Sequence, residues 1–345
     1  MKLYHLERMP QSLKALLIAA AWLALITVLH VTVNKEPQFR RKIRMGYMPV
    51  ITNLAAPLVD AASRQSDPYF EAVKFGSFAE MGEAFRAGHI QVAFVIAPLA
   101  VALHRQEIPL KIVYIGNRHE STLVVRKGLS CRSFADLEGK TIAVPMRFSG
   151  HMLALRRYES QLGMAADAIR IVEIPPPDMA VALASGGIDG YFVGEPFAAK
   201  SIVAGNASRL LNVEDIWPGF ICNLMIVRED LLELHPQWVS TLVAAAARSG
   251  LWAKNHVDEA VGIACTYWGQ DPNVVRYAFF NPEGRIRFDL FVPVAEEIQE
   301  IAREMHRFGL TEAQVDVSSI VDDRFAREVP LQSVGSFEDI LIPSR

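Results

Sequence analysis

The chain has 345 residues, of which 51% are hydrophobic and 21% are charged, with a formal net charge of −3. These values predict a globular protein with one large domain or two lobes, and they exclude a largely disordered chain. The slight acidic balance argues against a nucleic-acid-binding protein, which usually has a basic excess. Cys131, Cys222 and Cys265 form neither a C-x-x-C pair nor a zinc pattern, so we expect no disulfide framework, metal or cofactor.

The N-terminal segment has the pattern of a membrane helix. Three cations precede an uncharged run of 19 residues, 15–33. A helix needs about 20 such residues to cross a bilayer, whereas the apolar region of a cleaved signal peptide has roughly 7–15 and ends at a small-residue site. No such site follows the run, so we expect residues 1–34 to form an uncleaved transmembrane signal anchor. A cleaved signal peptide is the alternative. Residues 35–42 would form a tether, and the folded body would begin at residue 43.

Beyond this tether, strand-like and helix-like segments alternate, which is typical of a largely parallel sheet with crossover helices. Strands are predicted at residues 43–47, 72–75, 92–96, 112–116, 122–126, 141–144, 169–174, 188–193 and 224–228. Helices are predicted from about residue 53 and at 77–87, 150–162, 179–184, 236–255, 257–268, 273–277 and 291–308. The clearest helix start is Ser77, because Glu80 stands three residues later and completes a capping box.

Several motifs, in a fixed order, resemble one family of transport receptors. The segments V-E-I-P-P-P-D-M at 172–179 and I-D-G-Y-F-V-G-E-P-F at 188–197 are similar to the nitrate- and bicarbonate-binding proteins of ABC importers. That family extends to sulfonate, taurine and thiamine-pyrimidine receptors. The segments L-E-G-K-T-I-A-V at 137–144 and H-P-Q-W-V at 235–239 resemble its entry to the second lobe and its return helix. The resemblance covers about residues 43–305.

This resemblance implies an α/β type II periplasmic binding protein fold with a double crossover. Lobe 1 would comprise residues 43–120 and 228–345, and lobe 2 would comprise residues 121–227. The implied function is the solute-binding component of an ABC importer, on the periplasmic side of the inner membrane. It would capture a small anion or small organic solute in the inter-lobe cleft, with permease and ATPase subunits as partners and no nucleic acid.

Two other functions stay open. The first is a membrane-anchored solute sensor or accessory module, which sequence does not separate from an importer subunit. The second, less favoured, is an enzyme of the same fold that acts on a pyrimidine or a similar metabolite. The chain shows no Ser/His/Asp or Cys/His arrangement and no phosphate-binding loop. We therefore expect a protein that is not an enzyme.

The candidate site residues lie in loops at predicted strand ends. Ligands of open α/β sheets bind there, because helix N-termini with free N–H groups converge at that edge. The candidates for contact with solute are Asn53, Ser77, Phe78, Asn117, Ser149, Gly150, His151 and Glu195.

Some candidates have specific counterparts or competing roles. By resemblance, His151 aligns with a histidine that contacts the anion in nitrate-type relatives, and Phe78 stands where they carry a binding tryptophan. Ser77 could instead cap its helix, Phe78 could be an ordinary core aromatic, Asn117 could stabilise a turn, and Glu195 could latch the lobes.

One departure from the family bears on the solute. Nitrate-type relatives carry a cation after the G-E-P segment, but Cys222 or Asn223 stands there in this chain. Burying an anion without a paired cation is costly, so a small inorganic anion would depend on helix dipoles, on His151 and on Arg147 or Arg118. An organic solute with an apolar or aromatic part, such as an alkyl sulfonate or a pyrimidine, fits the phenylalanines of these segments at least as well: Phe78, Phe148, Phe197 and Phe220.

Overall fold

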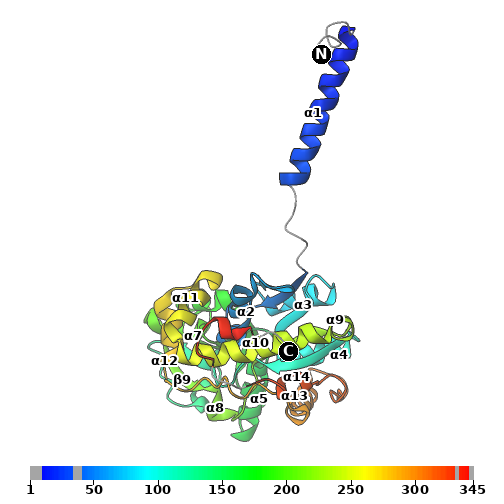
Figure 1. Cartoon of the computed structure of the whole chain (residues 1–345). Helices are drawn as coiled ribbons and strands as arrows, with labels where there is room; N and C mark the ends of the chain where they lie inside the picture. The colour runs from blue at the N-terminus through cyan, green and yellow to red at the C-terminus, as the bar shows by residue number, and fades with distance from the viewer. Residues whose placement is uncertain (1–9, 34–40, 331–333, 342–345) are drawn as a thin grey trace. The chain divides into compact units, whose positions relative to one another are not determined.

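The computed structural model describes residues 10–33, 41–330 and 334–341 (Figure 1). The chain divides into two units, Met1–Arg41 and Lys42–Arg345. The first unit contains helix α1 (Gln11–Val33), which confirms a helical conformation for residues 15–33. Its large apolar side chains, including those of Leu16 and Trp22, are exposed.

The transmembrane helix expected within residues 1–34 has no support from the structure. Among the helices in the described ranges, none is long and apolar enough to cross a membrane. Residues 35–40 of the predicted tether fall outside the described residues, and its last residue, Lys42, belongs to the first strand. The second unit begins with strand β1 (Lys42–Tyr47), one residue before the predicted start of the body.

The second unit is built on two five-stranded sheets. The first sheet has the order β2-β1-β3-β10-β4 and adds β2 (Tyr69–Lys74), β3 (Val92–Ile96), β4 (Leu110–Ile115) and β10 (Asn223–Arg228). The second has the order β7-β6-β8-β5-β9 and contains β5 (Ser121–Arg126), β6 (Thr141–Val144), β7 (Arg170–Glu173), β8 (Gly190–Gly194) and β9 (Ala207–Asn212). The chain therefore passes to the second sheet after β4 and returns after β9.

Both sheets are mixed, which corrects the expectation of a largely parallel sheet. Strand β10 is antiparallel to β3 and β4, and β5 is antiparallel to β8 and β9, whereas β1 and β6 pair in parallel with their neighbours. Strands β5 and β10 are the first strands after each passage between the sheets. Each therefore runs in the direction opposite to the neighbouring strands of the sheet that it joins. A buried apolar strand has the same sequence pattern in either direction.

Helices and short 3₁₀ turns surround the two sheets. They are η1 (Ile51–Asn53), α2 (Ala55–Ser63), α3 (Phe78–Arg86), α4 (Ala97–Arg105), η2 (Phe134–Leu137), α5 (Gly150–Gln161), α6 (Pro176–Ala184), α7 (Phe197–Val203), α8 (Val213–Ile216), α9 (Glu229–Leu234), α10 (Pro236–Asn255), α11 (Val257–Trp268), α12 (Pro272–Phe280), α13 (Ala295–Arg307), α14 (Arg324–Arg327) and η3 (Glu338–Ile340). The long helix α10 crosses one side of this unit (Figure 1) and packs against α2 and α14. Sequence did not predict α4, because its apolar residues continue the β3 run without a polar break.

The apolar core has two parts, one on each face of the first sheet. Side chains alternate along a strand, so Phe94 packs into the part beneath α2 and α10 while Val95 packs into the other. The second part extends from the first sheet into the second and includes Leu123 and Phe192. The two sheets are therefore joined by continuous apolar packing, and the polar groups between them lie in a water-poor environment.

Candidate functional site

Half of the predicted site residues meet in one buried group between the two sheets. We define the inner cluster by its members, each less than 5% exposed: Thr52, Asn53, Asn117, Glu120, Ser121, Thr122, His151, Glu195, Cys222 and Asn223. They come from η1, the passage from β4 to β5, the first turn of α5, the end of β8 and the return to β10. Four of the eight predicted residues belong to this cluster.

Hydrogen bonds join the segments that build this cluster, and one of them links the two sheets. Ile51 N donates to Glu195 O at 2.8 Å. Asn117 Nδ2 donates to Ile51 O at 3.0 Å, and Asn223 Nδ2 donates to Asn53 Oδ1 at 2.6 Å. Asn53 Nδ2 also donates to a β3 carbonyl, so both ends of the Asn53 amide are engaged by the protein. Asn53 therefore acts as scaffold here, whereas Asn117 keeps one open atom.

Two carboxyl groups are buried side by side in the cluster. Glu195 N donates to Glu120 Oε2 at 2.6 Å, and Thr122 Oγ1 donates to Glu195 Oε1 at 2.8 Å. Burial raises the pKa of Glu120 to about 7 and also raises the pKa of Glu195, because desolvation penalises the charged forms. Glu195 Oε2 accepts from Ala199 N. The Glu195 side chain is thus bonded within the second sheet and α7, and only its backbone carbonyl reaches the first sheet.

His151 is an uncharged histidine in the middle of the cluster. Its Nε2 lies 2.9 Å from Ser121 Oγ. Burial lowers the pKa of His151 to about 3, since the imidazolium would lose its hydration. The rings of Phe192 and Phe220 stand 5.1 Å and 5.7 Å from its own, at steep angles. His151 therefore contributes hydrogen-bonding atoms and a flat surface rather than a positive charge.

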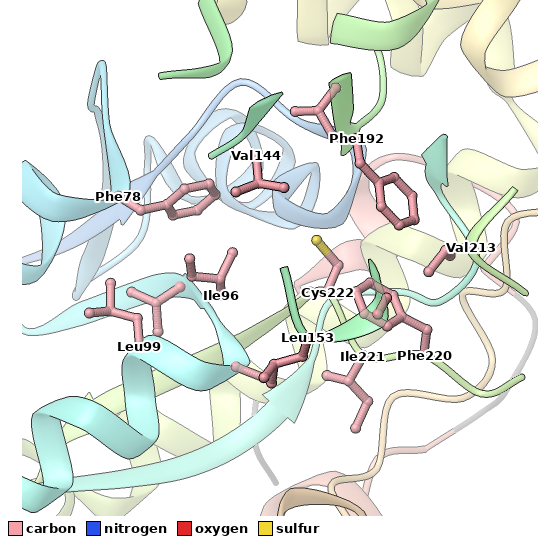
Figure 2. Packing of buried hydrophobic residues seen from close by; sticks show 14 of the residues in the cluster. Phe78, Ile96, Leu99, Val144, Leu153, Phe192, Val213, Phe220, Ile221 and Cys222 are labelled. Carbon is pink, nitrogen blue, oxygen red and sulfur yellow. The ribbon is translucent and has the colours of Figure 1, made fainter. Parts of the chain in front are cut away.

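Cys222 lies beside His151 and several other cluster members. Its Sγ is 3.3 Å from Asn223 Oδ1 and 3.9 Å from His151 Nε2. Figure 2 shows Cys222 between Ile96 on one side and Phe192 and Phe220 on the other. Burial raises the pKa of the Cys222 thiol well above its ordinary value, so the sulfur stays protonated and is a poor nucleophile.

The two arginines nearest the cluster are committed to protein partners. Arg118 forms a two-pronged pair with Glu297, at 2.8 Å and 2.7 Å. Arg285 pairs with Glu214 at 2.7 Å and donates to Thr122 Oγ1 at 2.9 Å and to the carbonyl of Ser121. Both guanidinium groups hold segments of the fold together.

The other predicted site residues have defined structural positions. Ser77 and Ser149 accept from backbone N–H groups three residues later and cap α3 and α5, so capping by Ser77 is confirmed. Phe78 is buried in the core on α3 and is directed toward Val144 (Figure 2). Gly150 packs beneath Phe220: a Cβ at this position would meet the ring at 2.7 Å.

An open pocket of about 310 Å³, separate from the inner cluster, lies between segments of both sheets. Its lining includes Phe75 and Gly76 before α3, Phe197 at the start of α7, and the exposed Lys74 and Lys200. Sequence reasoning did not single out these lysines. We call this pocket the outer pocket. It places cations at the periphery, in contrast to the inner cluster.

Sequence reasoning also missed Glu120, Thr122 and Arg285. A run of polar residues, Glu120 to Thr122, directly before an apolar strand was an available signal, because burial of such a run requires partners. No sequence signal pointed to Arg285, because it comes from a distant segment without regular secondary structure. No three His, Cys, Asp or Glu side chains within the described part of the chain are grouped to hold a metal ion.

Comparison with known proteins identifies a family and several relatives. Residues 36–265 match the model of the NMT1-like family. The taurine-binding periplasmic protein of Escherichia coli (strain K12) is 26% identical over 273 residues, which are 74% of this chain and 82% of that protein. A putative aliphatic sulfonates-binding protein of Bacillus subtilis (strain 168) is 26% identical over 209 residues, 60% of this chain and 61% of that protein. The periplasmic nitrate-binding protein from Synechocystis PCC 6803 has the same fold, with a TM-score of 0.76 and 14% identity, covering 84% of this chain and 88% of that one.

Proposed function

This chain belongs to the NMT1-like family, which confirms the resemblance drawn from its motifs, and we propose that it is the solute-binding component of an ABC importer. The observation that carries the proposal is the inner cluster, a buried polar group assembled from loops of both sheets. A small solute bound there contacts both halves of the molecule. An ABC permease and its ATPase would be the partners.

The proposed architecture has two lobes, residues 43–120 with 228–345 and residues 121–227. The distribution of strands supports two lobes, because β1 to β4 and β10 form one sheet and β5 to β9 form the other. Since β10 begins at Asn223, the first lobe would resume there rather than at residue 228. The two passages of chain between the sheets would act as a hinge. Solute shifts the open–closed balance because only the closed form offers it contacts from both sides.

The chemistry of the cluster supports binding rather than catalysis. A thiol nucleophile needs a lowered pKa and a nearby base. Cys222 has a raised pKa, and burial makes His151 a very weak base. The relatives reported above are binding proteins as well.

A periplasmic location is supported by the relatives named as periplasmic proteins. Attachment through residues 15–33 rests on the length and composition of that run alone. Fractionation of native host cells distinguishes an uncleaved membrane anchor from a cleaved signal peptide. Retention on washed membranes indicates an uncleaved anchor, and release by osmotic shock indicates a cleaved signal peptide.

Solute binding to the purified full chain tests the proposal. Nitrate, bicarbonate, alkyl sulfonates and pyrimidines are screened by thermal unfolding and by intrinsic tryptophan fluorescence. Trp217, whose ring lies 5.6 Å from Phe220, contributes to that signal. We expect at least one compound to raise the melting temperature in proportion to the logarithm of its concentration. A panel in which no compound stabilises the chain would contradict the proposal.

A paired variant locates the bound solute. His151→Gln keeps a donor for Ser121 but removes the ring and its Nδ1, so it should weaken binding. His104→Phe is the matched control, because His104 contacts Asp316 O at the far end of α4 instead. Equal loss of binding in both variants would argue against the inner cluster as the site.

A further inference from the structure

The two passages of chain between the sheets, residues 116–120 and 217–222, are tied to each other at Gly219. Gly219 N donates to His119 Nε2 at 3.2 Å. Gly219 O accepts from Arg118 Nη1. Both backbone polar groups of Gly219 therefore bond to side chains of the opposite passage, outside the inner cluster.

The backbone at this tie has an unusual conformation on both sides. Gly219 has a φ of 75° and His119 has a φ of 66°. This left-handed region suits glycine but is costly for a residue with a side chain. Such residues persist where their surroundings hold them, and they occur often at sites that switch between states. His119 is thus a strained residue on one passage, and its ring holds the other passage.

The bond to Gly219 determines which ring nitrogen of His119 carries the proton. A backbone N–H can only donate, so Nε2 must be the bare acceptor and the neutral ring must be protonated at Nδ1. In the imidazolium form both nitrogens carry a hydrogen and neither can accept. Protonation of His119 therefore breaks this bond and turns two donors toward each other.

The surroundings of His119 keep its ring neutral at neutral pH. Burial is the main reason that the pKa of His119 lies below its ordinary value of 6.5, and the carboxylate of Glu214 on α8 acts in the opposite direction. Three cations near the ring lower the pKa further: Arg285, Arg118 and Arg287. These arginines are paired in turn with carboxylates: Glu214, Glu297 and Asp289. The bond to Gly219 is consequently lost only in acid solution.

We propose, on the premise that the two passages form the hinge of a solute receptor, that His119 is a proton-sensitive clasp: its neutral ring ties the two passages together, and protonation releases Gly219 and loosens the hinge. With the clasp formed, the two passages bend as one unit. The bond belongs to the compact arrangement of the two sheets, so its loss disfavours that arrangement and with it the retention of solute.

The first test determines the tautomer and the titration of His119 in the full chain without solute. Long-range proton–nitrogen NMR of protein with labelled histidine distinguishes a protonated from a bare ring nitrogen, and His119→Gln identifies the signal of this ring by its disappearance. We expect a bare Nε2 in mildly alkaline solution and a titration midpoint below 6.5. A protonated Nε2 in that solution, or a midpoint at or above 6.5, would overturn the proposal.

The second test follows hydrogen exchange at the Gly219 amide, corrected for the pH dependence of exchange in unfolded peptides. In the parent chain, protection should fall about tenfold from mildly alkaline to acid solution, the usual effect of one lost hydrogen bond. His119→Gln keeps an acceptor oxygen near the position of Nε2 but has no titrating group, so its protection should stay constant. His119→Leu has no acceptor and should be weakly protected throughout. His89→Gln, at an exposed position after α3, is the control and should behave as the parent chain.

X-ray scattering of the same proteins measures the hinge itself. The radius of gyration of the parent chain should rise in acid toward that of His119→Leu, and it should rise less in His119→Gln. Glu120 titrates in both the parent chain and His119→Gln, so their difference reports on His119 alone, and this comparison stands if His119→Leu does not fold. Equal expansion of the parent chain and His119→Gln would overturn the clasp. A solute screen without a hit would contradict the receptor function instead, because these measurements use no solute.

Discussion

Replacement of Glu120 by glutamine should remove a pH-dependent cost from the folded protein. The Glu120 carboxyl is buried beside Glu195, and burial raises its pKa from the ordinary 4.5 to about 7. Glutamine has nearly the same shape. Its oxygen can accept from Glu195 N, as Glu120 Oε2 does at 2.6 Å, and its N–H can bond Ser121 Oγ. The substitution therefore removes the titration while keeping the contacts.

The sign of the effect follows from proton binding. Between pH 4.5 and about 7 the unfolded chain has released the Glu120 proton and the folded chain has kept it. Folded Glu120 therefore costs nothing below 4.5, and the free energy of unfolding falls as pH rises through this window. At 1.36 kcal/mol for each pKa unit, the total cost above the window is about 3 kcal/mol.

Urea denaturation at a series of pH values measures this cost. We expect Glu120→Gln to become more stable than the parent chain by about 3 kcal/mol between the acidic and the alkaline side of the window. The titration of Glu195 also makes the free energy of unfolding depend on pH. It does so in both proteins, so its effect largely cancels in the difference between them. Glu312→Gln, at an exposed position after α13, is the control and should show a flat difference. A flat difference for Glu120→Gln as well would refute the reasoning.

Two further substitutions test packing and closure. Gly150→Ala would press a methyl group against the Phe220 ring and should lower the free energy of unfolding by about 1–3 kcal/mol in urea denaturation. Gly262→Ala on α11 is the control: its added methyl group meets nothing within 4 Å, so this change should be neutral or stabilising. Equal destabilisation by both substitutions would remove the steric explanation. Arg157 on α5 pairs with Glu300 on α13, so Arg157→Glu should favour an open form with a larger radius of gyration in X-ray scattering. The swap with Glu300→Arg should restore the compact form, and failure to restore it would show that the pair does not control closure.

Ordered motifs and strand patterns were enough to predict the fold family and most strands of the second unit. Their limits appear at particular residues. Strand β9 was missed because its residues are partly exposed at a sheet edge, which weakens the apolar pattern. The direction of β5 and β10 was not predictable, since a fully buried strand such as 223–228 reads as the same apolar run in either orientation.

Sequence indicated some members of the inner cluster but not their hydrogen-bonding or protonation states. Strand-end positions indicated Asn117, His151 and Glu195, and the structure places them in the inner cluster. Their states depend on neighbours distant in sequence. The neutral His151 depends on burial beneath Phe220, and the committed state of Arg118 depends on Glu297, 179 residues later. Local pattern carries no information about such pairings.

The inner cluster is built largely on the two connections between the sheets. Asn117 and Glu120 lie on the passage from β4 to β5, and Cys222 and Asn223 lie where the chain returns to β10. With these connections as the proposed hinge, a residue change that adapts the inner cluster to a new solute would also change their stiffness and resting angle. A single substitution would then alter both the affinity for solute and the movement of the lobes. Redesign of its specificity would need compensating changes elsewhere, for instance along the α5–α13 contact, to keep opening fast enough for delivery.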